Sequence, residues 1–251
     1  MTIHSTIKTS MQSNKKLFAL LIDPDEVNES KVKQLLQLTK TTNVDFFFIG
    51  GSLITKTNFS DVILQLKEQT NTPVVIFPGS LYQIDNNADA ILLLSLISGR
   101  NPEYLIGQHV QAAPYLKKSN LEIISTGYML IDGENKSTVQ YISNTTPIPW
   151  DKNDIAVCTA LAGEMLGNGI IYMDSGSGAH YPVTADMITE VKSQITSPLI
   201  VGGGIRTPQQ MKNAYAAGAD VVVVGNAIEK NPSLLNEFSE VANSFSLEVD
   251  S

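Results

Sequence analysis

Short apolar runs recur along the chain, and polar residues follow them at their carboxyl ends. The first run, residues 17–22, is continuously apolar, as is typical of a parallel strand buried on both faces, and Asp23-Pro24-Asp25 follow it. Runs of this kind predict eight strands, at residues 17–22, 44–49, 73–77, 90–96, 121–125, 170–174, 198–201 and 220–224. Functional residues are expected after strands, because parallel strands bring their carboxyl ends to one face.

The segments between these strands have mostly helical periodicity. They predict helices at residues 28–40, 61–69, 102–118, 154–166, 184–195, 208–217 and 228–245. Residues 78–89 are the exception, because a crossover through a full helix normally needs about a dozen residues or more. The pattern therefore predicts an α/β fold, a (β/α)8 TIM barrel whose third helix is missing or replaced by a short loop.

No linker or low-complexity segment interrupts the pattern. Residues 1–251 are therefore expected to form one domain, with a polar leader at 1–16 and a frayed tail at 246–251. The polar stretch 132–150 is expected to be a long loop, and long loops in compact domains are often functional.

Composition narrows the classes of function. A formal net charge of −8 and a pI near 4.9, without a cluster of Lys and Arg, argue against nucleic acid as the main partner. No apolar run approaches the length of a membrane span and no signal-peptide core is present, so a soluble cytoplasmic protein is expected. The single cysteine, Cys158, excludes an internal disulfide and is expected to be a small buried residue.

The segment 169–179, GIIYMDSGSGA, changes from strand to turn chemistry within a few residues. A β-prone run ends at Asp174, and Gly176, Ser177 and Gly178 follow as a turn whose amides can converge on an oxyanion. This arrangement places a carboxylate beside an anion site. A plain connecting turn would use the same glycines, so the segment alone leaves both interpretations open.

Two further glycine-rich turns follow the seventh and eighth predicted strands. They are Gly202-Gly203-Gly204-Ile205-Arg206 and Gly225-Asn226-Ala227. In TIM barrels these loops, with a helix N-terminus, commonly bind phosphate through backbone amides. The alternative is a tight turn in which Arg206 forms only a surface ion pair. The loops indicate a phosphate ester, and flavin mononucleotide would satisfy them as well as a phosphorylated substrate.

Asp23 and Ser52 end neighbouring predicted strands on the same face, and they are candidate ligands of Mg²⁺. Magnesium is commonly held by one or two carboxylates together with substrate phosphates and water. Asp25 is the alternative ligand, and Asp23 could instead cap the loop that follows it. The residues alone leave these possibilities open.

Taken together, the motifs resemble those of the geranylgeranylglyceryl phosphate synthases and the related bacterial heptaprenylglyceryl phosphate synthases. The match spans most of the chain and rests on LIDPD at 21–25, FIGGS at 48–52, FPGS at 77–80, SGRNPEYLIG at 98–107, YMDSGSGA at 172–179, VGGGIR at 201–206 and VVVGN at 222–226. SGRNP and the long loop are similar to the longer branch, which includes archaeal members and some bacterial sequences. The family fold is a modified barrel without its third helix.

The resemblance implies transfer of a prenyl group, geranylgeranyl above all, from its diphosphate to the primary hydroxyl of sn-glycerol 1-phosphate. Pyrophosphate is released, and Mg²⁺ is the cofactor. Asp23 and Ser52 are implied to bind the metal with the diphosphate. The residues implied to hold glycerol phosphate are Tyr172, Met173, Asp174, Ser175, Gly176, Ser177, Gly178, Gly203, Gly204, Gly225 and Asn226.

Asp174 stands where the family usually has glutamate, the acceptor of the hydroxyl proton. Aspartate is one methylene shorter, so Asp174 either lies closer to the hydroxyl or orients it without deprotonating it. The prenyl tail needs an apolar groove, and the flank near Tyr82, Ile84 and Tyr104 is the candidate, although this loop could simply pack over the core. The resemblance also implies a homo-oligomer, a dimer or hexamer, and a product delivered to membranes.

Two other functions remain open on the sequence. One is a flavin mononucleotide oxidoreductase that uses the same phosphate loops. The other is a phosphate-binding barrel without catalysis, in which aspartate at position 174 marks a lost active site.

Overall fold

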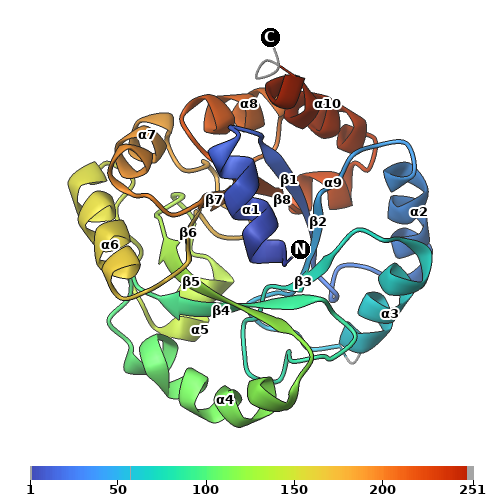
Figure 1. Cartoon of the computed structure of the whole chain (residues 1–251), viewed down its shortest axis with the longest axis horizontal. Coiled ribbons are helices and arrows are strands. Elements are labelled where there is room, and N and C mark those ends of the chain that lie inside the picture. The colour runs from blue at the N-terminus through green and yellow to red at the C-terminus, as the bar shows by residue number, and fades with distance from the viewer. Residues whose placement is uncertain (1, 57, 248–251) are drawn as a thin grey trace.

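All eight predicted apolar runs form strands, and the strands close into a parallel barrel in sequential order (Figure 1). The computed structural model describes residues 2–56 and 58–247. The strands are β1 (Leu17–Ile22), β2 (Phe46–Ile49), β3 (Val74–Ile76), β4 (Ala90–Leu96), β5 (Glu122–Leu130), β6 (Ile170–Asp174), β7 (Leu199–Gly202) and β8 (Val221–Val224). β1 pairs with β8, which closes the barrel, and the predicted TIM-barrel fold is confirmed.

Helices form a ring around the barrel (Figure 1). They are α1 (Ile3–Gln12), α2 (Glu29–Thr39), α3 (Phe59–Gln69), a π-helix η1 (Glu103–Gly107), α4 (Gln108–Lys118), α5 (Thr138–Ser143), α6 (Asn153–Met165), α7 (Ala185–Gln194), α8 (Pro208–Ala216), α9 (Asn226–Lys230) and α10 (Leu234–Leu247). Side-chain caps begin several of them: Asn28 accepts a hydrogen bond at α2, and Thr207 forms a capping box with Gln210 at α8. None of the helices in the described ranges is long and apolar enough to cross a membrane.

The third barrel helix is absent, as predicted. Residues 77–89 join β3 to β4 through turns, and β3 pairs with β4 only at Val75–Ala90 and Ile76–Ile91. β4 continues beyond this point and pairs with β5 as far as Leu96. The upper part of β4 therefore extends past the end of β3, on the flank between α3 and α4 that carries no helix.

The polar leader contains a structural element that the sequence analysis did not assign. Residues Ile3–Gln12 form α1, which lies across one end of the barrel (Figure 1). Ile3 and Ile7 are buried against the barrel interior, and the amides of Ile3 and His4 donate to Glu122 over 2.6 and 2.9 Å. The leader closes the base of the barrel, opposite the carboxyl ends of the strands.

Other boundaries differ for identifiable reasons. β5 continues past Ser125 to Leu130 and pairs there with β6. Gly127 is accommodated inside the strand because its neighbours leave little room for a side chain: a Cβ there would be 2.9 Å from the Ile97 side chain. The predicted last helix is two helices, α9 and α10, separated by a segment containing Pro232. The predicted loop 132–150 contains α5.

Cys158 and the first part of the predicted tail both lie on helices. Cys158 is exposed on α6, so the prediction of a buried cysteine is wrong. Ser246 and Leu247 belong to the last turn of α10, and the rest of the predicted tail, 248–251, lies outside the described residues.

Two apolar layers hold the fold together. Alternate strand residues such as Phe46 and Phe48 fill the barrel interior, whereas Phe47 and Ile49 pack outward against the helices. The interior layer ends near the carboxyl ends of the strands, where polar side chains replace apolar ones.

Candidate active site

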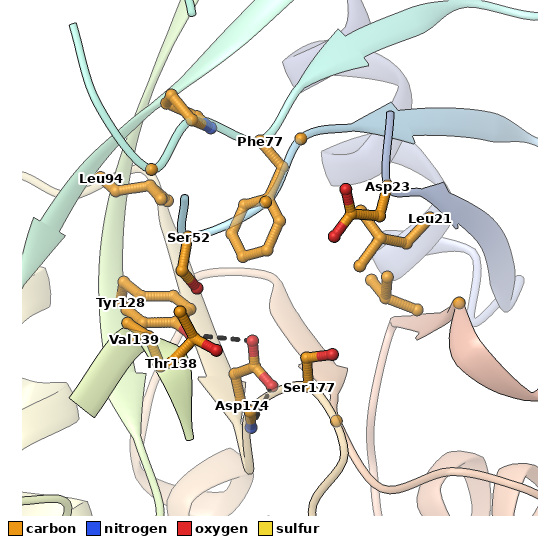
Figure 2. A pocket seen from close by; sticks show the side chains of 18 of the residues that line it. Leu21, Asp23, Ser52, Phe77, Leu94, Tyr128, Thr138, Val139, Asp174 and Ser177 are labelled. Atoms are coloured by element: carbon orange, nitrogen blue, oxygen red, sulfur yellow. Dashed lines mark hydrogen bonds between the residues drawn. The ribbon is translucent and has the colours of Figure 1, made fainter. Parts of the chain in front are cut away.

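A cavity of about 490 Å³ lies at the carboxyl ends of the strands (Figure 2). Its polar part is lined by Asp23, Ser52, Asp174 and Ser177, together with the glycine-rich loops. Its apolar part is lined by Leu81, Ile84, Leu92, Leu94, Tyr104, Ala112, Leu116, Val139 and Ile142. A single cavity therefore joins groups suited to phosphate and groups suited to a hydrocarbon.

The three glycine-rich turns meet in the polar part of this cavity. Gly176, Ser177, Gly178, Gly203, Gly204, Gly225 and Asn226 all line it. Gly203 and Gly204 have positive φ, 76° and 68°, so a side chain at either position would be strained as well as crowded. The Ser177 hydroxyl donates to Asn226 Oδ1 over 3.2 Å, which ties the loop after β6 to the loop after β8. This arrangement fits an anion held by backbone amides.

Two of the residues implied for glycerol phosphate do not face the cavity with their side chains. Strand alternation directs Tyr172 and Asp174 inward, and Met173 packs in the outer apolar layer. Ser175 is 2% exposed, and its hydroxyl is a buried oxygen without a hydrogen-bond partner. Met173 and Ser175 are therefore outside the cavity lining, and neither side chain is positioned to contact a ligand there.

Arg206 does not form the surface ion pair considered from the sequence. Its guanidinium donates to the backbone carbonyls of Ala179 and His180, the latter over 3.3 Å. These carbonyls belong to the loop after β6, so Arg206 fastens the loop after β7 to it. Arg206 also lines the cavity, although the residue as a whole is exposed, so it lies at the rim beside the glycine-rich loops.

Asp174 is buried, with 6% of its surface exposed, and both carboxylate oxygens are bonded (Figure 2). Oδ1 accepts the Gly176 amide over 2.6 Å, and Oδ2 accepts the Tyr128 hydroxyl over 2.8 Å. Burial raises the pKa of the Asp174 carboxyl above its ordinary value, although both hydrogen bonds favour the ionised form. A carboxyl with a raised pKa is better suited to accepting a proton than an exposed aspartate is.

Of the two candidate metal ligands, the Asp23 carboxylate faces the cavity and the Asp25 carboxylate is occupied by backbone and side-chain donors. The Asp25 carboxylate accepts the Thr55 amide and hydroxyl, both over 2.7 Å, and the Lys56 amide over 2.9 Å, so it ties two loops together. The Asp23 carboxylate points into the cavity, with Ser52 also on its wall (Figure 2). Burial raises the pKa of the Asp23 carboxyl and the charges of Asp25 and Glu26 add to this shift, whereas the Asp25 amide and the Lys56 ammonium oppose it.

The donor set suits a hard cation held mainly by substrate. No group of three or more His, Cys, Asp or Glu within the described ranges is arranged to hold a metal. Asp23 and Ser52 offer one carboxylate and one hydroxyl, which fits Mg²⁺ only if substrate phosphate and water complete its coordination. The residues therefore fit a metal that arrives with a phosphorylated ligand.

Three aromatic rings pack on one another in the cavity wall, next to Asp174. Phe77 stacks on Tyr172 with centroids 5.2 Å apart, and Tyr128 meets Tyr172 edge-on at 5.5 Å. All three rings line the cavity. They fill the centre of the barrel mouth beside Asp174.

Two of the three residues predicted for the prenyl groove line the apolar part of the cavity. Ile84 and Tyr104 line the cavity, but the Tyr82 side chain is 89% exposed and does not. Helix α5, which the sequence analysis treated as loop, covers this part with Val139 and Ile142. The Tyr104 hydroxyl donates to the Ile142 carbonyl over 3.4 Å, which connects the covering helix to η1.

Sequence reasoning missed several residues of the site. Tyr128 lies beyond the predicted end of β5, and Phe77 was assigned to a strand end and to the FPGS motif but not to the site. Glu229, on α9, is 9% exposed, and its carboxylate accepts the Asp23 amide over 3.0 Å. The signal for Tyr128 was present, since the apolar run continues through Met129 to Ile131 after Gly127.

Comparison with known proteins identifies the family. The PcrB family matches residues 10–242, almost the whole barrel. The chain belongs to the PcrB family. This result confirms the resemblance that the motifs indicated.

The chain is also similar to proteins named geranylgeranylglyceryl phosphate synthase. That of Chitinophaga pinensis is 52% identical over 245 residues, which cover 96% of this chain and 97% of the relative. That of Thermococcus kodakarensis is 41% identical and the match covers 87% and 86% of the two chains. Both relatives therefore match over most of their length.

Solved structures agree with this assignment. The (S)-3-O-geranylgeranylglyceryl phosphate synthase of Thermoplasma acidophilum, in complex with sn-glycerol-1-phosphate, has a TM-score of 0.91 and 31% identity and covers 97% of this chain and 99% of its own. Tryptophan synthase subunit alpha of Legionella pneumophila is 16% identical, with a TM-score of 0.59 over 97% and 99% of the chains. The second likeness shows only that the barrel is shared.

Proposed function

We propose that this PcrB-family protein is a prenyltransferase. It forms an ether between the C1 carbon of geranylgeranyl diphosphate and the primary hydroxyl of sn-glycerol 1-phosphate, and it releases pyrophosphate. The observation that carries the proposal is the single cavity that joins the glycine-loop anion site, the buried Asp174 carboxylate and an apolar part near Ile84. The relatives named as synthases and the neighbour bound to sn-glycerol-1-phosphate support it.

Each part of the cavity has a task in this reaction. The loops at Ser177, Gly203 and Gly225 bind the phosphate of the acceptor, which leaves its free hydroxyl beside Asp174. Asp174 accepts the proton that the hydroxyl loses as it attacks, directly or through a neighbour. The apolar lining excludes water from the reacting carbon, so hydrolysis of the diphosphate does not compete.

Asp23 and Ser52 would hold Mg²⁺ together with the diphosphate. Bound there, the cation would neutralise the charge that develops on the departing pyrophosphate. Glu229 accepts the Asp23 amide and so fixes the end of β1 next to this position. The fit of the two ligands to a cation that comes with phosphate supports the proposal.

The flavin alternative is less consistent with the cavity. A flavin phosphate in the same loops would need its planar ring system at the barrel mouth, where Phe77, Tyr128 and Tyr172 already pack together. A barrel without catalysis would have no use for a buried carboxylate beside the anion site, since such burial costs stability. The prenyltransferase uses both features.

The test is a reaction of the purified protein with geranylgeranyl diphosphate, sn-glycerol 1-phosphate and Mg²⁺. We expect release of pyrophosphate and a geranylgeranylglyceryl phosphate ether detected by mass spectrometry. Diphosphates of C15, C20 and longer chains establish the preferred length, and a flavin spectrum of the purified protein tests the oxidoreductase. Absence of pyrophosphate release with every chain length would contradict the proposal.

We also propose that the protein is a homo-oligomer that places one outer face of α6 in a subunit interface. That face exposes Ile155, Cys158, Met165 and Leu166, with Met165 83% and Leu166 81% exposed. An apolar outer face on a barrel helix is typical of a covered surface. Light scattering measures the oligomeric state, and Met165→Glu should shift it toward the monomer.

The cytoplasmic location and the delivery of product to membranes stay predictions.

A further inference from the structure

Tyr128 is a buried acidic group inside the cavity to which the proposed reaction assigns no task. It lies on β5 directly opposite Tyr172 of β6, and its hydroxyl reaches the Asp174 carboxylate two residues further along β6. It is 5% exposed, and its side chain lines the same cavity as Asp174. A buried tyrosine hydroxyl needs a partner, and here the partner is the group expected to accept a proton.

The Asp174 carboxylate has little freedom to move toward a substrate. The Gly176 amide holds Oδ1, and a Cβ at Gly203 would lie 2.4 Å from the same oxygen, so backbone closes that side. The Tyr128 hydroxyl occupies Oδ2. A glutamate at position 174 would extend one methylene further into the cavity. The Asp174 carboxylate is shorter, and the Tyr128 hydroxyl that it bonds lies in front of it.

We propose that Tyr128 is a catalytic residue that relays the proton of the acceptor hydroxyl to Asp174. The inference rests on the proposed prenyltransferase function. The Tyr128 oxygen contacts the primary hydroxyl of glycerol phosphate, and its own proton lies on the hydrogen bond to Asp174 Oδ2. The shorter aspartate is thereby extended by a phenol instead of by a methylene.

The step balances without any further reactant. The acceptor oxygen forms a bond to C1 of the prenyl group while the bond from C1 to the diphosphate oxygen breaks and leaves its electron pair on pyrophosphate. The acceptor proton moves to the Tyr128 oxygen, and the Tyr128 proton moves to Asp174 Oδ2. Tyr128 ends as a neutral phenol and Asp174 as a carboxylic acid, so no tyrosinate has to form.

The test compares single-turnover rates of the wild-type protein and Tyr128→Phe with geranylgeranyl diphosphate and sn-glycerol 1-phosphate. Phe keeps the ring and removes only the hydroxyl, and we expect the rate to fall by roughly 10²–10⁴-fold, the range of a positioned acid–base group. Binding of sn-glycerol 1-phosphate should change little. The double variant Tyr128→Phe with Asp174→Asn should be no slower than the slower single variant, because both changes break one chain.

Two readouts separate a relay from a structural role. A proton inventory in H₂O and D₂O mixtures should be curved for the wild type, since two protons move, and linear for Tyr128→Phe. Asp174→Glu should recover part of the rate lost in Tyr128→Phe, since the vacated space admits the longer acid to the hydroxyl. In the wild-type background the same glutamate should be slow, because Gly203 and the Tyr128 hydroxyl leave it no room.

Tyr215→Phe is the matched control. Tyr215 is also buried, and its hydroxyl donates to the Leu17 carbonyl over 2.8 Å at the base of the barrel. That variant should lose thermal stability and keep its rate. A near-normal rate in Tyr128→Phe, or a linear inventory in the wild type, would overturn the relay while leaving the synthase intact; a wild-type protein without turnover would instead refute the function.

Discussion

The base and the mouth of the barrel each bury an aspartate, and the two carboxylates have different partners. At the base, Asp220 is 3% exposed and lies 2.6 Å from the Lys192 ammonium and 3.8 Å from that of Lys16. Its carboxylate also accepts the Leu199 amide over 2.8 Å. At the mouth, Asp174 is bonded to a phenol and an amide, and no salt bridge to it is found in the described part of the chain.

This difference separates stability from function. At the base of the barrel the lysine and aspartate charges neutralise one another. Burial lowers the pKa of Lys16, and the nearby Asp220 carboxylate opposes that shift. At the mouth the charge of Asp174 is left without a cation, and burial raises its pKa. Buried charged groups without an opposite charge nearby are concentrated at functional sites, because there a bound substrate provides the missing partner.

The largest expected effect is on chemistry at the mouth. Asp174→Asn removes the proton acceptor, so turnover should fall by roughly 10²–10⁴-fold with little change in glycerol phosphate affinity. The raised pKa also places the acid limb of the wild-type profile above the ordinary aspartate value of about 3.9. Steady-state rates of the variant and the wild type across pH measure both the loss of turnover and the position of the acid limb. Near-normal turnover in the Asn variant would show that Asp174 is not the base.

The next effect concerns stability at the base. Asp220→Asn removes the carboxylate that the Lys16 and Lys192 ammonium groups contact, and breaking a buried pair in this way costs about 3–5 kcal/mol. The thermal midpoint should fall by roughly 6–20 °C. Turnover of the folded fraction should stay normal, because the cavity lining does not include Asp220.

Asp174→Asn provides the opposite stability result and so sharpens the comparison. Because the folded pKa of Asp174 is raised, its ionised form costs stability above that pKa, and the cost vanishes below the unfolded value of about 3.9. The Asn variant should therefore have a higher thermal midpoint at neutral pH and no gain near pH 4. Equal losses from Asp174→Asn and Asp220→Asn would remove the distinction between mouth and base.

A smaller effect is expected at the proposed metal position. Asp23→Asn should raise the Mg²⁺ concentration needed for half-maximal rate, and the KM for the prenyl diphosphate, by about 10–100-fold. The KM for glycerol phosphate should change little, since only the diphosphate is expected to share the metal. Asp25→Asn is the comparison, because its carboxylate serves Thr55 and Lys56. Full turnover in excess chelator would contradict the metal assignment.

The smallest effect concerns selectivity in the apolar part. Ile84→Trp adds bulk to the cavity lining, and overpacking of this kind costs about 1–3 kcal/mol, so use of the C20 diphosphate should fall about tenfold or somewhat more. Shorter products should then be favoured. Tyr82→Trp is the control, because Tyr82 lies in the same loop and is exposed. Product mass spectrometry with mixed chain lengths decides; an unchanged preference in Ile84→Trp would place the tail elsewhere.

Much of the fold could be predicted because its signals are local. Each strand is a short apolar run, and the missing helix follows from the twelve residues available at 78–89. The helix α1 was missed because only Ile3 and Ile7 mark its buried face among polar neighbours. In α5 the strongest apolar signal is Val139 and Ile142, too short a pattern to separate from a loop.

The site was predicted where its residues follow strands and missed where contacts are distant. Asp23, Ser52, Asp174 and the glycine turns were found by that rule, and all line the cavity. From its charge, Arg206 was considered for a surface ion pair, whereas in the structure its guanidinium donates to backbone carbonyls of another loop. No local pattern marks such a contact, because the partners lie 26 or more residues away.

The sequence by itself determined the order of the strands and of most helices, the barrel, the glycine-rich loops and the position of Asp174 at a strand end, because each depends on neighbouring residues. Only the tertiary structure decided that Tyr128 bonds Asp174 across 46 residues of chain, and that Asp25 ties loops while Asp23 faces the cavity. The physical reason is closure of the barrel. Register between neighbouring strands sets which side chains meet at the mouth, and that register is a property of the whole sheet.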